Sequence, residues 1–245
     1  MNKETILILG AKSDIGIALA HEFAKNKNKI ILAGRNIVKL ENERKAIMSL
    51  YSVEVVLHEF NVLNLSDHLK LINELKNLPS IVISTIGLLG NQDEDELNSE
   101  KAIKVIKSNY EGPALIFLKF AKKFEQRGYG TLVGFSSVAG ERGRANNYIY
   151  GSAKSGFTTF LSGLRNKYSS KGVHVITVLP GYVFTKMTKN MNLPKFLTAQ
   201  PKEVAQDVVK ALSNNKNIIF TPSIWRLIIF ILKLIPESLF KKTNI

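Results

Sequence analysis

Short apolar runs alternate along the chain with longer segments in which apolar residues recur at the spacing of a helix. Runs of five to eight residues predict buried strands, and the periodic segments between them predict helices. The predicted strands span residues 5–10, 29–33, 53–60, 81–86, 130–136, 174–179 and 217–221. The predicted helices span residues 15–26, 38–50, 65–78, 101–127, 149–170 and 202–212.

Regular alternation of strands and helices is typical of an α/β protein, because each crossover helix returns the chain to a parallel strand. Right-handed crossovers then give a doubly wound, Rossmann-type sheet of seven parallel strands with helices on both faces. We expect one domain over residues 1–222, to which residues 223–245 add a helical C-terminal tail. Two polar connections, 87–100 and 183–200, leave the carboxyl edge of this sheet, where ligands bind. The second is long enough to be a mobile lid over a substrate.

The charge and the cysteine and histidine content of the chain exclude several classes of function. The 245 residues carry a formal net charge of +14 and include no cysteine and only four histidines, which lack ligand spacing. Disulfide scaffolds, cysteine-ligated metals and thiol nucleophiles are therefore excluded, and no metal site is expected. The charge favours anionic partners, although a solvated lysine-rich surface is an equal alternative. No nucleic-acid-binding motif accompanies it, so no nucleic-acid partner is expected.

The C-terminal tail suggests contact with a membrane surface. Residues 224–235 are apolar except for Arg226 and Lys233, which lie seven positions apart on one helix face. Such a helix is too short to span a bilayer but suits its interface, with Trp225 at the boundary. The N-terminus lacks the pattern of a signal peptide. We therefore expect a cytoplasmic protein whose residues 223–242 contact an anionic inner membrane face, with burial in a subunit interface as the alternative.

A glycine-containing turn joins the first predicted strand to the first predicted helix. Gly10 permits a tight turn, and Gly16 permits close packing of the helix on the sheet. The turn and the start of the helix offer backbone N–H groups to a pyrophosphate. The residues expected to line this site are Gly10, Lys12, Ser13, Asp14, Ile15 and Gly16. An ordinary glycine turn without a ligand is the alternative.

The residue after the second strand bears on the choice of cofactor. An acidic residue at this point binds the ribose diol of NAD, whereas a basic residue accommodates the 2′-phosphate of NADP. Arg35 stands there and favours NADP(H). The alternative is NAD(H), with Arg35 as a surface residue or stacked on the adenine.

A tyrosine and a lysine four residues apart follow the fifth predicted strand. Tyr150 and Lys154 share one face of a predicted helix, and Ser137 ends the strand before it. An adjacent ammonium favours tyrosinate, so we expect Lys154 to lower the pKa of Tyr150 toward neutrality. Tyr150 can then donate a proton to a carbonyl oxygen that receives a hydride, while Ser137 donates a second hydrogen bond. A surface pair without chemistry is the alternative.

Together these motifs, with Leu179-Pro180-Gly181, stand in an order that resembles the classical short-chain dehydrogenase/reductase family over residues 5–222. The resemblance implies that Ser137 polarises the carbonyl, Tyr150 donates the proton and Lys154 binds the nicotinamide ribose. It also implies that Asn109 holds a proton-relay water and that the chain forms homo-oligomers. The further cofactor-binding positions that it implies are Asn61, Val62, Gly87, Pro180, Gly181, Val183 and Thr185.

Three positions depart from the family pattern. Asp14 replaces the middle glycine of the turn, and we expect it to cap the first helix with its charge turned away. Thr85-Ile86-Gly87 replaces Asn-Ala-Gly after the fourth strand. Asn61 replaces the acidic residue that contacts adenine.

Four segments resemble a narrower group, the decaprenylphosphoryl-2-keto-ribose reductases: GAKSDIG, IGLLGNQ, FSSVAGERGRANNYIYGSAKSG and SIWRLIIFILKLIPESLF. This resemblance implies reduction of a 2-keto pentose on a polyprenyl phosphate in cell-envelope glycan synthesis, with a flavin-dependent oxidase as partner. Glu141, Arg142 and Arg144 are candidate substrate residues, because arginines bind phosphate; a solvated charged loop is the alternative. The rival functions are reduction of a 3-keto acyl or sphingoid ketone, and a non-catalytic nucleotide-binding scaffold.

Overall fold

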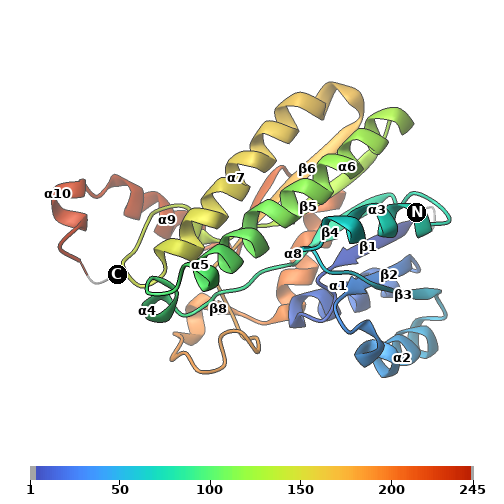
Figure 1. The fold of residues 1–245 in the computed structure, drawn as a ribbon, viewed down its shortest axis with the longest axis horizontal. Helices are drawn as coiled ribbons and strands as arrows, with labels where there is room; N and C mark the ends of the chain where they lie inside the picture. Colours follow the sequence, from blue (N-terminus) through green and yellow to red (C-terminus); the bar gives the residue numbers. More distant parts are fainter. Residues whose placement is uncertain (1–3, 244–245) are drawn as a thin grey trace.

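A computed structural model describes residues 4–243. Its centre is a sheet of seven parallel strands in the order β3-β2-β1-β4-β5-β6-β9. The strands are β1 (Thr5–Leu9), β2 (Lys29–Gly34), β3 (Val55–Glu59), β4 (Ile81–Ser84), β5 (Gly130–Phe135), β6 (Val173–Pro180) and β9 (Ile218–Thr221). Figure 1 shows the sheet between two layers of helices, which confirms the predicted doubly wound fold.

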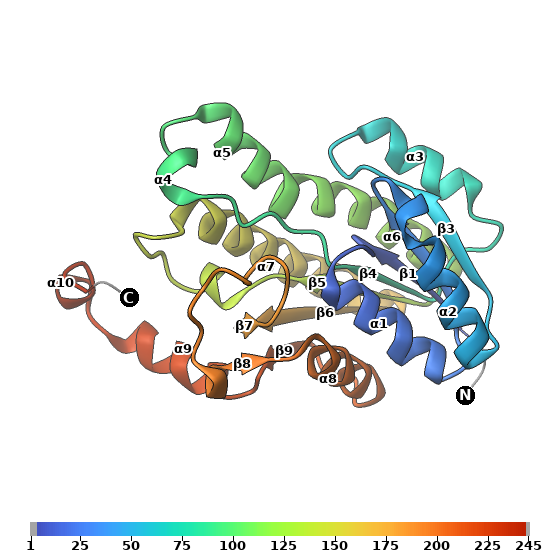
Figure 2. The same ribbon diagram turned by 90° about the horizontal axis from the view of Figure 1, so that it is seen from below.

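Each face of the sheet has its own hydrophobic core, because successive side chains of a strand point to opposite faces. Ile6 and Ile8 pack with α1 (Asp14–Lys25), α2 (Glu41–Tyr51) and α8 (Pro201–Ser213). Leu7 and Leu9 pack on the other face with α3 (Leu65–Glu74), α6 (Gly112–Arg127) and α7 (Tyr148–Tyr168). The two layers are seen from below in Figure 2. Burial on both faces explains why the strands are continuous apolar runs in the sequence.

The long helix predicted over residues 101–127 is divided into three parts. α5 (Ser99–Ile106) passes into a π-helical turn, Lys107–Glu111, before α6 begins at Gly112. Pro113 lacks an N–H and its ring crowds the carbonyl of Asn109 four residues earlier, so a regular helix is not possible there. The wider turn contains the fully buried Asn109. The short helix α4 (Gln92–Asp95) lies in the connection before α5.

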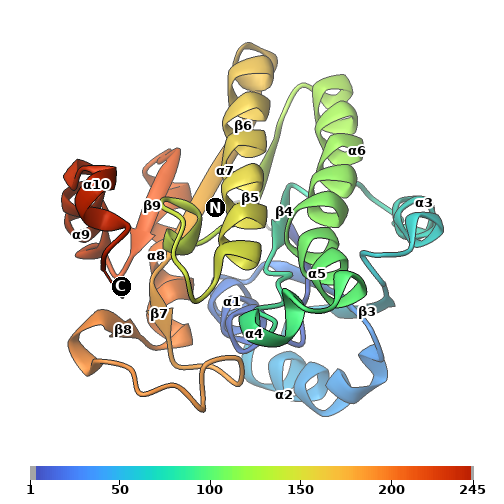
Figure 3. The same cartoon turned by 60° about the vertical axis from the view of Figure 1, so that its left-hand side comes forward.

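The 183–200 connection, here called the lid, begins and ends in a small two-stranded sheet. β7 (Tyr182–Val183) pairs with β8 (Thr198–Ala199), so both ends of the lid are held close together. In Figure 3 the lid is the long orange loop below the start of α1. The remaining short turns of 3-10 helix are Ile37–Leu40, Val138–Gly140, Ser169–Lys171 and Lys195–Leu197.

The tail forms α9 (Trp225–Leu234) and α10 (Glu237–Phe240). Trp225 and Ile229 are buried against Val138 and Leu179. The opposite side of α9 exposes Leu227, Phe230, Ile231 and Leu234, with Phe230 at 61% and Leu234 at 66%. Within residues 4–243, no helix has both the length and the apolar character needed to cross a membrane.

Candidate active site

Two neighbouring cavities lie along the carboxyl edge of the sheet. The first, of about 340 Å³, is lined by the glycine turn and the ends of β2 and β3. The second, of about 160 Å³, is lined by the residues around Tyr150, the start of the lid and Trp225. Both include Thr85, Ile86 and Gly87 after β4. The cavities therefore adjoin and form one elongated site at the position where doubly wound folds bind ligands.

The glycine turn is held in a conformation that only small residues can occupy. Gly10 has φ +79°, and a Cβ there would lie 2.9 Å from Ile86 Cγ1. A Cβ on Gly16 would lie 3.0 Å from Ala11 Cα. The hydroxyl of Ser13 accepts a hydrogen bond from the Gly16 N–H at 3.0 Å and caps α1. The turn thus brings the N-terminus of α1 to the groove, as a pyrophosphate site requires.

The expectation that Asp14 caps this helix is wrong. Ser13 supplies the cap, and Asp14 is the first helical residue. The Asp14 carboxylate instead accepts a hydrogen bond from the Lys186 backbone N–H at 2.6 Å and lies 3.5 Å from the Lys186 ammonium. Asp14 is therefore joined to the lid.

Thr85 holds the glycine turn in place where the family has asparagine. Its hydroxyl lies 3.1 Å from the Leu9 carbonyl, 3.0 Å from the Gly10 carbonyl and 2.9 Å from the Ser13 hydroxyl. The departure at position 85 thus keeps a polar link between β1 and β4.

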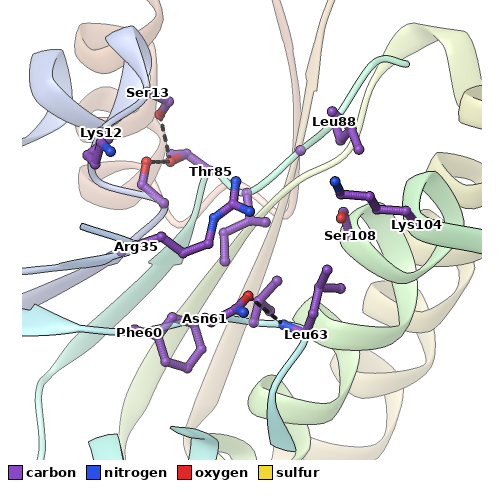
Figure 4. Close-up of a pocket in the computed structure, with 15 residues that line it drawn as sticks. Lys12, Ser13, Arg35, Phe60, Asn61, Leu63, Thr85, Leu88, Lys104 and Ser108 are labelled. Atoms are coloured by element: carbon purple, nitrogen blue, oxygen red, sulfur yellow. Dashed lines mark hydrogen bonds between the residues drawn. The ribbon is translucent and has the colours of Figure 1, made fainter. Parts of the chain in front are cut away.

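Three basic side chains reach the first cavity, namely Lys12, Arg35 and Lys104. In Figure 4 the Arg35 guanidinium and the Lys104 ammonium enter from opposite sides. None of the three forms an ion pair within residues 4–243. Unpaired cations around one cavity create a positive potential, which fits a phosphorylated nucleotide. Lys104 comes from α5 and Ser108 from the π-helical turn after it, and no local motif marks either residue in the sequence.

Asn61 and Val62 line the same cavity, as expected from the resemblance. The Asn61 side-chain oxygen accepts a hydrogen bond from the Leu63 N–H at 3.2 Å, and its backbone N–H donates to Asp67 at 2.9 Å. The side-chain amide nitrogen of Asn61 has no hydrogen-bond partner within residues 4–243. Asn61 therefore offers a donor to the cavity but no negative charge.

Tyr150 and Lys154 lie on one face of α7 and line the second cavity with Ser137. Lys154 is only 3% exposed, and its ammonium donates a hydrogen bond to the Phe135 carbonyl at 2.9 Å. The ammonium lies 5.7 Å from the centre of the Tyr150 ring. The three predicted residues are thus brought together at the end of β5.

The pKa values of this pair differ from the expectation. Burial raises the pKa of Tyr150 to about 12, and the Ser137 hydroxyl acts in the opposite direction by hydrogen bonding. Burial lowers the pKa of Lys154 to about 7. The pKa of Tyr150 is therefore not lowered toward neutrality, because burial disfavours the charged tyrosinate.

Ser137 and Ser136 have separate roles. The Ser136 hydroxyl donates to the Lys154 carbonyl at 2.8 Å and lies 2.6 Å from the Thr158 hydroxyl, so it links β5 to α7. The Ser137 hydroxyl accepts a hydrogen bond from the Ala139 N–H at 3.1 Å, and it lines the second cavity together with Tyr150. The geometry thus favours Ser137 as the donor to a substrate oxygen.

Asn109 is placed beside Lys154 through the π-helical turn. Its amide nitrogen donates to the Leu88 carbonyl at 2.7 Å and to the Val105 carbonyl at 2.8 Å. A Cβ on Gly87 would lie 3.2 Å from the Asn109 oxygen and 3.5 Å from the Lys154 ammonium. Gly87 therefore lies against both groups, and no side chain at this position separates them.

The far wall of the second cavity is formed by Pro180, Gly181, Val183 and Thr185, together with Trp225. A Cβ on Gly181 would lie 1.8 Å from the Trp225 ring nitrogen, so only glycine fits beneath the indole. The same nitrogen donates to the Leu197 carbonyl of the lid at 3.0 Å. The tail thus contributes a wall of the candidate active site, a role that the sequence did not reveal.

Two of the three candidate substrate residues contact the tail rather than the cavity. Glu141 pairs with Lys233. Arg142 binds the Leu232 carbonyl and the Glu237 carboxylate, and its guanidinium lies 3.6 Å from the centre of the Phe240 ring. Arg144 does line the second cavity. Glu141 and Arg142 therefore fasten α9 and α10 to the turn after Ser137.

Comparison with known proteins gives the same assignment. The sequence model of the family described as short chain dehydrogenase matches residues 4–195. An uncharacterised oxidoreductase of Mycobacterium tuberculosis is 32% identical over 97% of this chain and 96% of its own length. The 3-oxoacyl-[acyl-carrier-protein] reductase FabG of Rickettsia prowazekii is 28% identical over 88% of this chain and 92% of its own.

The fold also matches solved structures. A short-chain dehydrogenase from Sphingobium yanoikuyae in complex with NADPH superposes with a TM-score of 0.82, at 21% identity, over 96% of this chain and 97% of that one. These comparisons agree with the geometry of the molecule, which has the glycine turn, the parallel sheet and a cavity lined by Ser137, Tyr150 and Lys154. The chain belongs to the short-chain dehydrogenase family and is an NAD(P)-dependent oxidoreductase of that family.

Proposed function

We propose that this protein reduces a ketone with NADP(H), using Tyr150 as the proton donor. The observation that carries the proposal is the meeting of Ser137, Tyr150 and Lys154 in one cavity next to the cavity of unpaired cations. A group that donates a proton and a groove that accepts a phosphorylated dinucleotide are both needed for this reaction.

The residues of the first cavity fit NADP(H). Gly10 and the N-terminus of α1 can hold the pyrophosphate, and Asn61 faces the adenine side. Arg35, Lys12 and Lys104 supply the positive charge that a 2′-phosphate requires. The similar Sphingobium protein is named as a complex with NADPH, which supports the same choice here.

When bound, the nicotinamide supplies a hydride to the carbonyl carbon. Tyr150 is a protonated phenol at neutral pH, because its pKa is about 12, and it therefore carries the proton that the carbonyl oxygen needs. The Ser137 hydroxyl donates a second hydrogen bond to this oxygen as negative charge develops on it. Together they orient the carbonyl and stabilise the developing alkoxide.

Lys154 has two tasks in this scheme. Its ammonium, held by the Phe135 carbonyl, can bind the ribose of the cofactor. In its charged form it also favours tyrosinate and so assists proton release from Tyr150. Asn109 lies beside Lys154 next to Gly87, where it can hold the water from which Lys154 takes up a proton again.

We propose that the substrate is the 2-keto pentose of a polyprenyl phosphate, made by a flavin-dependent oxidase. The second cavity continues into a third of about 230 Å³. The two share five residues, the polar Arg144, Asn147 and Tyr182 and the apolar Leu89 and Met191. Arg144 suits a phosphate, and Asn147 suits a sugar hydroxyl. These polar groups support a lipid-linked sugar.

The exposed face of α9 supports a substrate that resides in a membrane. Leu227, Phe230, Ile231 and Leu234 share one side of the helix. Arg226 and Lys233 lie to one edge of that side, Lys233 in its ion pair with Glu141. Apolar side chains bordered by cations are typical of a helix that lies in an anionic lipid interface. Because Trp225 begins the same helix and lines the second cavity, such docking would bring the site to the lipid surface.

The alternative substrate is a 3-oxoacyl chain. It is favoured by the similarity to the Rickettsia FabG protein and by apolar residues of the second cavity, among them Leu89, Met187 and Met191. An acyl substrate needs a long apolar passage but no cation at Arg144.

The test is the oxidation of NADPH and NADH by the purified protein with two substrates, a polyprenyl-phosphoryl 2-keto pentose and a 3-oxoacyl thioester. We expect turnover of the keto pentose, with NADPH preferred, and a loss of at least tenfold in kcat/KM for Arg144→Met. Turnover of the thioester alone, unaffected by Arg144→Met, would establish the alternative. If the protein binds the cofactor but reduces neither substrate, the result favours the non-catalytic nucleotide-binding scaffold.

Membrane docking is tested by substitution rather than by truncation. Removing residues 223–245 would also remove Trp225 from the wall of the active site. A triple variant that changes only the exposed face of α9 avoids this problem; its substitutions are Leu227→Ser, Phe230→Ser and Ile231→Ser. We expect this variant to lose most of its binding to anionic vesicles while it still turns over a short-chain analogue of the substrate; unchanged vesicle binding would contradict the docking.

A further inference from the structure

The carboxylate of Asp14, in place of the family's middle glycine, is joined to a residue 172 positions away. Its Oδ2 accepts the backbone N–H of Lys186 at 2.6 Å, and its Oδ1 lies 3.5 Å from the Lys186 ammonium. In the chain from residue 4 to 243, this contact supplies the only hydrogen bond and the only ion pair that join residues 185–193 to an element outside the lid. A single residue of α1 thus holds this part of the lid.

The base of the lid is secured by other contacts. The Phe184 N–H donates to the Ala199 carbonyl at 3.0 Å, and Trp225 donates to Leu197 at 3.0 Å. Near the Asp14 contact the lid has a preformed turn, in which the Thr188 hydroxyl donates to the Val183 carbonyl at 2.6 Å. Opening at Asp14 would therefore release a structured turn while both ends of the lid stay in place.

The contact is made where the two cavities adjoin. Ser13 lines the first cavity and Ile15 the second, so Asp14 lies between residues of both. Thr185, Met187 and Thr188 of the lid line the second cavity. Figures 2 and 3 show the orange lid approaching the start of α1. The contact therefore joins the two sides of the groove near the glycine turn that faces a pyrophosphate.

We propose that Asp14 and Lys186 form a clasp that closes the lid over the bound dinucleotide, and that Asp14 is a positioning residue which limits cofactor release. The proposal rests on the proposed function, because it requires a dinucleotide in the groove. It also accounts for the departure at position 14. The Lys186 ammonium balances a carboxylate that would otherwise stand uncompensated beside a pyrophosphate.

The contacts are suited to repeated opening. The Lys186 side chain is 80% exposed and that of Asp14 is 24% exposed, so solvent screens the ion pair and leaves it weak. The hydrogen bond from the backbone N–H to a carboxylate is the stronger part, because one partner is charged. Asp14 is also stable in the first turn of α1, where the helix dipole favours negative charge. A clasp of this strength can open within a catalytic cycle.

The experiment measures hydrogen exchange of residues 184–192 in the free protein and the dissociation rate of NADPH in rapid-mixing experiments. Asp14→Ala removes both contacts, Asp14→Asn keeps an acceptor for the N–H, and Lys186→Met removes only the ammonium. Lys189→Met is the matched control, because Lys189 lies in the same lid and forms no ion pair with any of residues 4–243. We expect Asp14→Ala to speed both exchange and release about tenfold. Asp14→Asn and Lys186→Met should change them by about two- to threefold, and Lys189→Met should match the wild type.

The two readouts separate the clasp from the function on which it rests. Hydrogen exchange is measured without cofactor. If Asp14→Ala exchanges faster but the wild type does not bind NADPH, the proposed function is refuted, whereas the contact between Asp14 and the lid is supported. Wild-type exchange in Asp14→Ala would overturn the clasp even if NADPH binds. Slower NADPH release from Asp14→Ala would also overturn it, because the carboxylate would then act only by repelling the pyrophosphate.

Discussion

Replacement of Lys154 by methionine should change how the stability of the protein depends on pH. Burial lowers the pKa of Lys154 from 10.5 to about 7, so between these values the unfolded chain binds a proton that the folded protein does not. The free energy of unfolding therefore rises with pH in this window. Methionine has a similar length but no proton to bind, so the variant lacks this contribution.

The magnitude follows from the two pKa values. Each pKa unit corresponds to about 1.36 kcal/mol. Integrated from pH 6.0 to pH 8.5, the contribution of Lys154 raises the free energy of unfolding of the wild type by about 2 kcal/mol relative to the variant. The absolute stability of the variant is less informative, because the Phe135 carbonyl loses its donor, which costs about 1–3 kcal/mol at every pH.

Urea unfolding of both proteins at several pH values between 6.0 and 8.5 measures this difference. His68 and His174 also have pKa values lowered by burial, but they are present in both proteins and cancel in the comparison. Parallel stability curves for the wild type and Lys154→Met would refute the reasoning, because Lys154 would then keep its proton throughout this range.

Three further predictions concern the two cavities. Ser137→Ala should lower kcat by about a hundredfold or more with little change in NADPH affinity, because the lost hydrogen bond forms with the developing oxyanion; steady-state kinetics and fluorescence titration measure the two values. Arg35→Ala and Lys104→Met should each weaken NADPH binding about tenfold or more and NADH binding much less, with Lys107→Met as the control on the same helical segment. Trp225→Ala should lower the free energy of unfolding by about 3–5 kcal/mol and impair turnover, because the indole fills the space above Gly181; chemical denaturation tests the first effect. The two variants need not lose NADPH affinity to the same extent. If a variant loses as much affinity for NADH as for NADPH, its residue does not bind the 2′-phosphate.

The strands were predictable because parallel strands buried on both faces need continuous apolar runs. Residues 174–179 were expected as a strand, and β6 spans Val173–Pro180. The doubly wound arrangement followed from the crossover rule, but the order of the strands was not predicted and is known only from the structure. The division of the 101–127 helix was also encoded locally, since Pro113 forbids a regular bond to Asn109.

The positions of Ser137, Tyr150 and Lys154 could be predicted, but their electrostatics could not. A spacing of four residues places Tyr150 and Lys154 on one helix face without showing how deeply the lysine is buried. Lys154 is buried against β5, where the Phe135 carbonyl accepts a hydrogen bond from its ammonium. Gly87 lies beside the same ammonium. Desolvation therefore raises the pKa of Tyr150, whereas the sequence had predicted that it would be lowered.

Charged residues on loops were the least predictable part of the site. Glu141 and Arg142 have partners about 90 residues away in the tail, and Asp14 has its partner 172 residues away in the lid. Surface charges carry no periodic pattern, so the sequence alone gives no means to pair them. Lys104 was missed for the same reason, because α5 reaches the cofactor cavity only through the folded chain.

The role of Tyr150 as proton donor is tested by comparing the wild type with Tyr150→Phe in NADPH-dependent reduction of a ketone substrate, with NADPH binding measured separately. We expect kcat to fall by about a thousandfold or more while the NADPH dissociation constant stays within about twofold, because the phenol supplies the proton but does not hold the adenosine half of the cofactor. Turnover by Tyr150→Phe within about tenfold of the wild-type rate would show that another group protonates the oxygen and would contradict the central claim.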